Sequence, residues 1–214
     1  MPRLGTIVLD FDGVLAETEP AKDAAFEELF ARYAEHREVM LAYHRERHSA
    51  PRREKFEHCI YEVLGRPGDT AAVDEMARDF AALVVDRVIA APEVPGTTDF
   101  LQEFSSTLPL YVASVTPEDE LGKILAARGI APFLRAAFGN PPTPKAEAIR
   151  AVLAREELKP EEALIVGDSL SDYRAAEETG IGFIGRDSGL PFGGIDVPLH
   201  RDMHAVAVAV RERL

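Results

Sequence analysis

The stretch Thr6-Ile7-Val8-Leu9-Asp10-Phe11-Asp12-Gly13 joins a short apolar run to two acids and a glycine. A continuous apolar run of this length that ends at a turn predicts a strand buried on both faces. Comparable runs follow at 110–113, 163–166 and 181–184, with a weaker one at 135–138. Helical patterns lie at about 97–105, 117–128, 144–156 and 172–179. This alternation predicts an α/β fold, a doubly wound, Rossmann-like parallel sheet covered by helices.

The segment 17–92 has a different pattern, with no convincing strand. Its apolar residues recur at helical spacing, and Pro92 and Pro95-Gly96 close it. We therefore predict an α-helical cap at 17–92, inserted into an α/β core that is formed by 1–16 and 93–214. Because ligands of open α/β sheets bind outside the carboxyl ends of the strands, we expect this insertion to act as a lid.

Composition narrows the classes of partner. The 214 residues include 24 basic and 37 acidic side chains, which gives a net charge of −13. A field of this sign repels nucleic acid and anionic membranes, so neither is expected as a general partner. The single cysteine, Cys59, cannot form an internal disulfide, and neither a signal peptide nor a run of roughly 18 apolar residues is evident. We expect a cytoplasmic protein.

Acidic residues follow two of the predicted strands. Asp10 and Asp12 stand two apart in an extended chain, so both side chains can face one site. Asp168 ends the run 163–166, and Asp172 lies where a helix begins. Asp172 could merely complement that helix's dipole, with Ser171 as its cap, but capping does not explain paired acids at two strand ends. Oxygen-only ligands of this kind favour Mg²⁺ over zinc.

Two further residues fit phosphate chemistry. Ser114 closes the run 110–113 and offers a hydroxyl and a backbone N–H to an anion. Lys145 lies in the first turn of a helix that Thr143-Pro144 opens, where it is poorly matched to the positive end of the helix dipole. A facing phosphate or carboxylate would remove that conflict. Taken singly, each residue is also compatible with an ordinary polar strand end or a solvated lysine.

The order of these features resembles the haloacid dehalogenase-like (HAD) hydrolase superfamily, in its C1-capped phosphatase and β-phosphoglucomutase-like branch. The stretch 10–20 (DFDGVLAETEP) resembles the first motif, Ser114 the second, Lys145 the third and the stretch 167–172 (GDSLSD) the fourth. The resemblance covers essentially the whole chain, because the helical insertion stands where the C1 cap of the family does.

The resemblance implies an aspartyl-phosphate mechanism acting on a small phosphorylated metabolite. Asp10 would be the nucleophile, and Asp12 would protonate the leaving alkoxide and then activate water. Ser114 and Lys145 would bind the transferring phosphoryl oxygens.

The resemblance also implies a Mg²⁺ site. Asp10, the backbone carbonyl of Asp12 and Asp168 would hold the ion, with Asp172 in support. Together with Lys145, the ion would oppose the repulsion between a carboxylate and a phosphate dianion.

Other activities of the superfamily remain as alternatives. Dehalogenases and phosphonatases lack the second acid of the first motif, so Asp12 favours a phosphate ester. The mutase branch shares Gly13-Val14 but usually carries histidine where Lys22 stands. A non-catalytic binding protein on the same fold is the third alternative, and the intact acids argue against it. Neither the specific ester nor the oligomeric state follows from the sequence.

The predicted cap contains a dense basic segment, in which five cations occur within 45–55. We hypothesise that Arg53 and Lys55, with His48, reach a second anionic group of the substrate; the wording Arg-x-Lys-Phe also resembles caps of some sugar-phosphate enzymes. The alternative is an exposed segment whose arginines pair with neighbouring glutamates.

His44 and His48 have the spacing of metal ligands on one helix face. No third ligand has convincing spacing, because His58 and Cys59 lie across a predicted turn. Zinc therefore stays a minor alternative.

Overall fold

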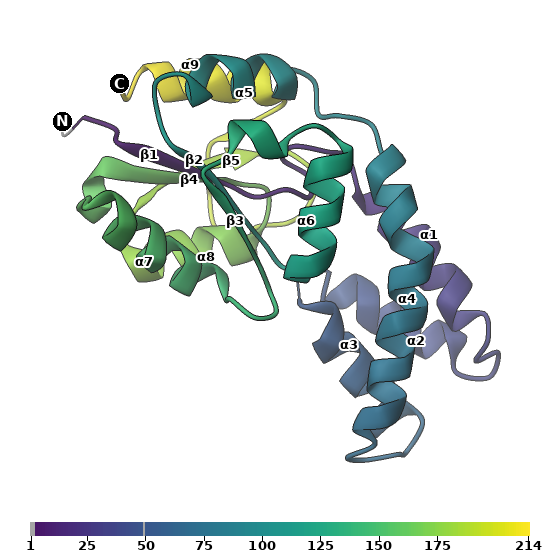
Figure 1. Cartoon of the computed structure of the whole chain (residues 1–214). Coiled ribbons are helices and arrows are strands. Elements are labelled where there is room, and N and C mark those ends of the chain that lie inside the picture. The colour runs from purple at the N-terminus through teal and green to yellow at the C-terminus, as the bar shows by residue number, and fades with distance from the viewer. Residues whose placement is uncertain (1–2, 49) are drawn as a thin grey trace. The chain divides into compact units, whose positions relative to one another are not determined.

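The computed structural model describes residues 3–48 and 50–214, which fall into two compact units (Figure 1). One unit contains the chain up to Thr18 together with Pro92–Leu214, and the other is Glu19–Ala91. Whether 17–92 and the remainder behave as separate domains, as we predict from the sequence, stays a prediction.

The first unit is built on a parallel sheet of six strands in the order β3-β2-β1-β4-β5-β6. The strands are β1 (Thr6–Leu9), β2 (Leu110–Ser114), β3 (Ala136–Gly139), β4 (Ala163–Gly167), β5 (Gly182–Arg186) and β6 (Leu199–His200). All five runs seen in the sequence form strands, so the prediction of a doubly wound parallel sheet is confirmed. Leu9 lies opposite both Val112 and Val166, so the central strands end side by side.

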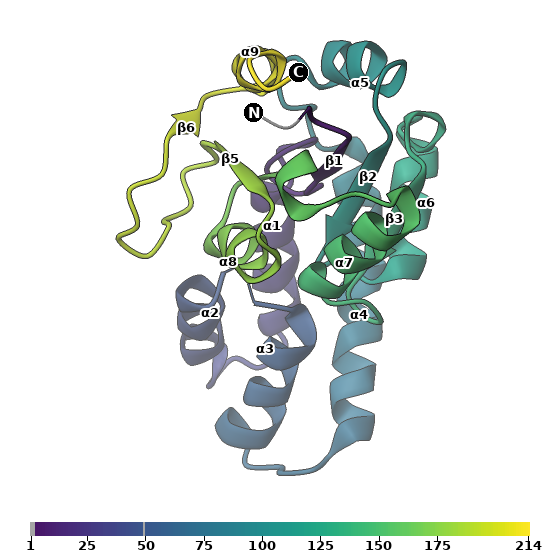
Figure 2. The same ribbon diagram turned by 90° about the vertical axis from the view of Figure 1, so that its left-hand side faces the viewer.

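Helices cover both faces of this sheet (Figures 1 and 2). They are α5 (Thr97–Ser105), α6 (Glu118–Ala127), α7 (Lys145–Glu156), α8 (Leu170–Thr179) and α9 (Met203–Arg211), with short 3₁₀ turns at Ala131–Phe133 and Pro160–Glu162. Figure 2 shows α7 and α8 on one face and α5 and α9 on the other, while α6 packs beside β3. The sequence did not predict α9 or the two-residue strand β6.

The core beneath α7 and α8 explains why the central strands read as apolar runs. Val8, Tyr111 and Ile165 point from β1, β2 and β4 into one cluster with Ile149 and Val152 of α7. All five are essentially inaccessible to solvent. Burial on both faces of β1, β2 and β4 holds their carboxyl ends at one edge, and that edge carries the acids.

The second unit is helical throughout, as its sequence pattern predicts. It contains α1 (Glu19–Phe30), α2 (Arg37–Glu46), α3 (Arg52–His58), a π-helical turn (Cys59–Val63) and α4 (Thr70–Ala90). Its core is aromatic: the ring of Phe26 lies 4.3 Å from that of Phe80 and 5.9 Å from that of Phe56. None of the helices within 3–48 and 50–214 has the length and apolarity needed to cross a bilayer.

We expect Ile165→Ala to lower the free energy of unfolding by about 2–5 kcal/mol, because the truncation opens a cavity beneath α7 and α8. Urea denaturation monitored by circular dichroism measures the change. Val208→Ala on α9 is the control, since Val208 is 52% exposed and loses little packing. Equal effects of the two substitutions would contradict this account of the core.

Candidate active site

The acids predicted from the sequence gather at the carboxyl ends of the central strands. We call this group, with Lys145, Ser114 and the residues that contact it there, the carboxylate edge. Asp10 follows β1, and its backbone N–H donates to the Val166 carbonyl at 2.9 Å. Asp12 lies two residues further on, and Asp168 directly follows β4. All three are at most 5% exposed. Buried acids in this number need cations or hydrogen-bond donors to stay ionised.

Lys145, the first residue of α7, supplies a cation inside this group. Its Nζ lies 3.0 Å from Asp10 Oδ2 and also contacts Asp172 Oδ1. Burial would lower the pKa of Lys145, but the attraction of Asp10 and Asp172 outweighs it and raises that pKa above its ordinary value. Lys145 therefore keeps its proton, which accounts for a lysine at the positive end of a helix dipole.

The carboxylate of Asp10 experiences opposing influences. Burial, the largest of them, raises its pKa to about 7, and the charges of Asp172 and Asp12 act in the same direction. The ammonium of Lys145 lowers it. The backbone N–H of Phe11 donates to Asp10 Oδ1 at 2.7 Å and fixes the plane of the carboxylate.

Asp172 has both a structural and an electrostatic contact. Its Oδ2 accepts hydrogen bonds from the backbone N–H of Ser169 at 3.2 Å and from the Ser169 hydroxyl at 2.6 Å, forming a capping box at the start of α8. The N-cap of α8 is therefore Ser169, so the alternative in which Ser171 caps this helix is wrong. Because the cap holds Asp172 in place, its other oxygen faces Lys145 in a fixed position.

Three hydroxyl groups donate hydrogen bonds to Asp12. Thr18 donates to its Oδ1 at 2.6 Å, while Ser114 and Thr116 donate to its Oδ2 at 3.3 and 3.1 Å. The hydroxyl of Ser114 thus contacts an acid in this structure, and its predicted contact with phosphoryl oxygens stays a prediction. The sequence reasoning missed Thr18 and Thr116, although the spacing of Ser114 and Thr116 repeats that of Asp10 and Asp12.

The donor set of the site fits Mg²⁺. Asp10, Asp168 and Asp172 each offer a carboxylate oxygen, and these atoms all lie within 4.8 Å of one another. Oxygen ligands alone are what Mg²⁺ prefers. Gly13 permits the close approach of Asp168: its φ is 68°, and a Cβ at this position would lie 1.9 Å from Asp168 Oδ2.

An ion pair fixes the segment that leaves the first unit. Arg186, 5% exposed at the end of β5, donates from both terminal nitrogens to the two carboxylate oxygens of Glu17. The backbone N–H of Glu17 donates to the Pro92 carbonyl at 2.9 Å, and Ala16 pairs with Glu93 in an antiparallel bridge. Residues 16–17, which lead out of the first unit, are therefore paired with residues 92–93, which return to it. This pairing lies next in sequence to Thr18, whose hydroxyl donates to Asp12.

The basic residues predicted to contact substrate have partners inside the helical unit. Arg53 donates to Glu57 at 3.1 Å and to Asp74 at 2.8 Å. Lys55 is 3% exposed and donates to the His48 carbonyl at 2.8 Å. The imidazole of His48 contacts Glu19 at 3.1 Å. Substrate binding by His48, Arg53 and Lys55 stays a prediction.

Comparison with known proteins adds independent evidence. The family model of the haloacid dehalogenase-like hydrolases matches residues 4–180. No curated protein sequence matches the chain.

Several solved structures share the fold. A predicted phosphoglycolate phosphatase from Haemophilus somnus has a TM-score of 0.76 at 16% identity, covering 98% of this chain and 99% of its own. A candidate β-phosphoglucomutase from Thermotoga maritima has a TM-score of 0.72 at 22% identity, covering 99% and 100%. The candidate hydrolase YfnB from Bacillus subtilis, described as bound to magnesium, has a TM-score of 0.72 at 18% identity, covering 98% and 100%.

At these identities the solved structures establish the fold alone. The family model spans most of the chain and includes every residue of the carboxylate edge described above. This protein therefore belongs to the haloacid dehalogenase-like hydrolases.

Proposed function

We propose that this hydrolase is a Mg²⁺-dependent phosphatase that cleaves a small phosphorylated metabolite through an aspartyl-phosphate intermediate. The observation that carries the proposal is the buried ammonium of Lys145 between Asp10 and Asp172. A buried cation beside a strand-end carboxylate offsets the repulsion that otherwise keeps an aspartate from a phosphate dianion. The solved structures named as phosphatases are consistent with a phosphate monoester as substrate.

Asp10 is the proposed nucleophile. One of its oxygens attacks phosphorus, the bond from phosphorus to the ester oxygen breaks, and the phosphoryl group is transferred to the carboxylate. The phosphoryl oxygens become further acceptors for Lys145, which already donates to Asp10. Ser114, at the end of β2, is the second proposed phosphoryl ligand.

Asp12 is the proposed general acid and base. It starts the reaction protonated, gives that proton to the leaving alkoxide, and as the resulting carboxylate removes one from the water that hydrolyses the aspartyl phosphate, which restores the acid. Three hydroxyl donors from Thr18, Ser114 and Thr116 orient its carboxylate. The ammonium of Lys145 contacts Asp10, whereas three hydroxyls donate to Asp12, and environments that differ in this way allow two acids to take different roles.

Asp10, Asp168 and the backbone carbonyl of Asp12 are the proposed Mg²⁺ ligands, with Asp172 close by. A bound Mg²⁺ would neutralise charge on the phosphoryl oxygens. Asp168 is held against Gly13, and Asp172 is held by the α8 cap, so both carboxylates are positioned before any ion binds.

The test of this function is release of inorganic phosphate from a panel of phosphate esters in the presence of Mg²⁺. We expect Asp10→Asn to abolish release and Asp12→Asn to lower kcat by about 10²–10⁴-fold, because general acid–base catalysis contributes on that scale. Asp99→Asn is the control, since the Asp99 side chain is 76% exposed.

The products distinguish the proposal from its alternatives. Isomerised sugar phosphates without free phosphate would replace it with a phosphotransferase. No turnover of any ester, including p-nitrophenyl phosphate, would replace it with a non-catalytic binding protein.

Metal dependence gives a second prediction. EDTA should abolish phosphate release and Mg²⁺ should restore it. Asp168→Asn should raise the Mg²⁺ concentration for half-maximal activity by about tenfold or more, because a neutral amide replaces a charged carboxylate ligand. Titration of activity against Mg²⁺ measures this shift, again with Asp99→Asn as control. Full activity of the wild type in EDTA would exclude the metal from the mechanism.

The hydroxyl of Thr116 gives a third prediction. Thr116→Val removes a donor 3.1 Å from Asp12 Oδ2 and should lower kcat about ten- to a hundredfold, since a hydrogen bond to a charged group is worth about 1.5–3 kcal/mol. Thr116→Ser keeps the hydroxyl and should retain activity near that of the wild type. A change in KM with kcat unaltered, or the same fall in kcat in both variants, would show that Thr116 does not act by orienting Asp12.

A further inference from the structure

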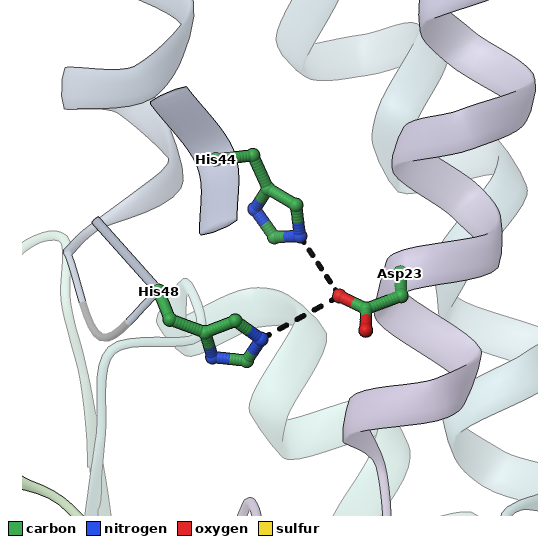
Figure 3. A group of neighbouring side chains, drawn as sticks. All are labelled: Asp23, His44 and His48. Atoms are coloured by element: carbon green, nitrogen blue, oxygen red, sulfur yellow. Dashed lines mark hydrogen bonds and ion pairs between the residues drawn. The ribbon is translucent and has the colours of Figure 1, made fainter. Parts of the chain in front are cut away.

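Three side chains that commonly bind metals meet inside the helical unit. None of them has a chemical step in the proposed phosphatase reaction, although His48 is also a predicted substrate contact. Figure 3 shows Asp23 of α1 facing the imidazoles of His44, on α2, and His48, just after α2. A ligand atom from each lies within 4.8 Å of the others. The histidine spacing is visible in the sequence, but the third group comes from another helix, 21 residues before His44.

The separations of the Asp23 carboxylate from both imidazoles suit a small ion. Asp23 Oδ1 lies 2.9 Å from His44 Nε2 and 3.5 Å from His48 Nε2. Ligands about 2.0–2.1 Å from a tetrahedral zinc ion stand about 3.3–3.4 Å apart. The distance from Asp23 to His48 is already close to that value, and the distance from Asp23 to His44 needs to grow by only about half an ångström.

The surroundings hold both imidazoles in place from outside. His44 is 3% exposed, and its ring stacks on Phe26 with centroids 3.9 Å apart. Its Nδ1 is 3.1 Å from Lys55 Nζ, and His48 Nδ1 is 3.1 Å from Glu19 Oε2. An acceptor on the second ring nitrogen, as Glu19 provides for His48, is typical of metal-binding histidines because it fixes the orientation of the ring. Lys55 instead holds His44 as a donor while no ion is bound.

The cluster is also open to an ion. The side chains of Asp23 and His48 are 49% and 20% exposed, while His44 closes the inner side. Two histidines and one carboxylate leave a fourth position for water or for another ligand. Charges of both signs lie near the cluster, with Lys22 and Lys55 as cations and Glu19 and Glu54 as acids beside Asp23.

We propose that Asp23, His44 and His48 form a second metal site that binds a divalent transition ion, with Zn²⁺ as the preferred occupant. Two imidazole nitrogens favour Zn²⁺ over Mg²⁺, which selects oxygen ligands. The site is chemically distinct from the carboxylate set of Asp10, Asp168 and Asp172. A bound ion cross-links α1 to the end of α2 and stabilises the helical unit.

Metal binding at His44 displaces a proton from the ring. Without an ion, Lys55 donates to Nδ1 of His44, so the proton of the neutral ring is on Nε2 and faces Asp23. Binding at Nε2 releases that proton to solvent, and the Lys55 proton moves onto Nδ1, which leaves Lys55 as a neutral amine that accepts a hydrogen bond from the ring. One proton is therefore released per ion at His44.

Calorimetric titration of the full-length protein with ZnCl₂ in excess Mg²⁺ tests the proposal, because Mg²⁺ occupies oxygen-only sites. We expect one Zn²⁺ per chain, with affinity reduced at least about tenfold in both Asp23→Asn and His48→Gln. His204→Gln is the control, since His204 is a surface imidazole 58% exposed, and Asp168→Asn should also keep the site. His48 is chosen over His44 because replacing His44 would disturb the packing of Phe26.

Visible absorption of the Co²⁺-substituted protein provides a second readout. Four-coordinate Co²⁺ should give intense bands in the wild type that disappear in Asp23→Asn and His48→Gln. Absence of Zn²⁺ binding in the wild type, or binding that survives both substitutions, would overturn the proposal. Binding lost in Asp168→Asn but kept in His48→Gln would assign the ion to the carboxylate edge instead and would equally overturn it.

Discussion

The burial of one ammonium group among carboxylates is the constraint on which the carboxylate edge depends. Lys145 has 8% of its side chain exposed, and Asp172 has none. A charge removed from water is tolerated only with partners at close range, and removing one partner leaves the other uncompensated. The three groups come from different places: Asp10 from the end of β1, Asp172 from the first turn of α8 and Lys145 from the first turn of α7. Their meeting therefore requires the correct strand order and the correct start of two helices at once.

The sheet supplies that precision through ordinary packing. Leu9 is in register with Val112 and Val166, which places the ends of β1, β2 and β4 together. Because side chains pack into the core from both faces, a one-residue slip of a strand would turn each side chain to the opposite face, disrupt this packing and separate the acids. Stability and chemistry therefore depend on the same alignment. The capping box of α8 also serves both stability and chemistry, since one oxygen of Asp172 caps the helix while the other faces Lys145.

Much of the fold was predictable because it is encoded by local pattern, as in the apolar runs that became β1, β2 and β4. The acids and Lys145 were found in the same way, because each directly follows a strand or begins a helix. Helix α9 was missed because Ala205–Val210 alternates two small apolar residues and shows no helical period; Asp202 caps it by accepting from the Ala205 N–H at 2.9 Å. The contacts of Thr116 with Asp12 and of Arg186 with Glu17 join residues more than a hundred positions apart, and no local pattern reports such pairs.

In the helical unit, too, the local sequence does not show which environment each charged side chain occupies. The five cations within 45–55 look alike as a sequence, yet the structure divides them by environment. Arg47 and Arg53 pair with glutamates at the surface, which is the arrangement of the alternative in which this segment is exposed. Such exposed pairs contribute little to stability. Lys55 is enclosed between His44 and the Phe26 ring, where burial lowers its pKa to about 8. Because the enclosed amine of Lys55 contacts the His44 ring, the protonation of each group affects the other. Lys55 therefore belongs physically with the imidazoles of this unit and not with the surface arginines beside it in sequence.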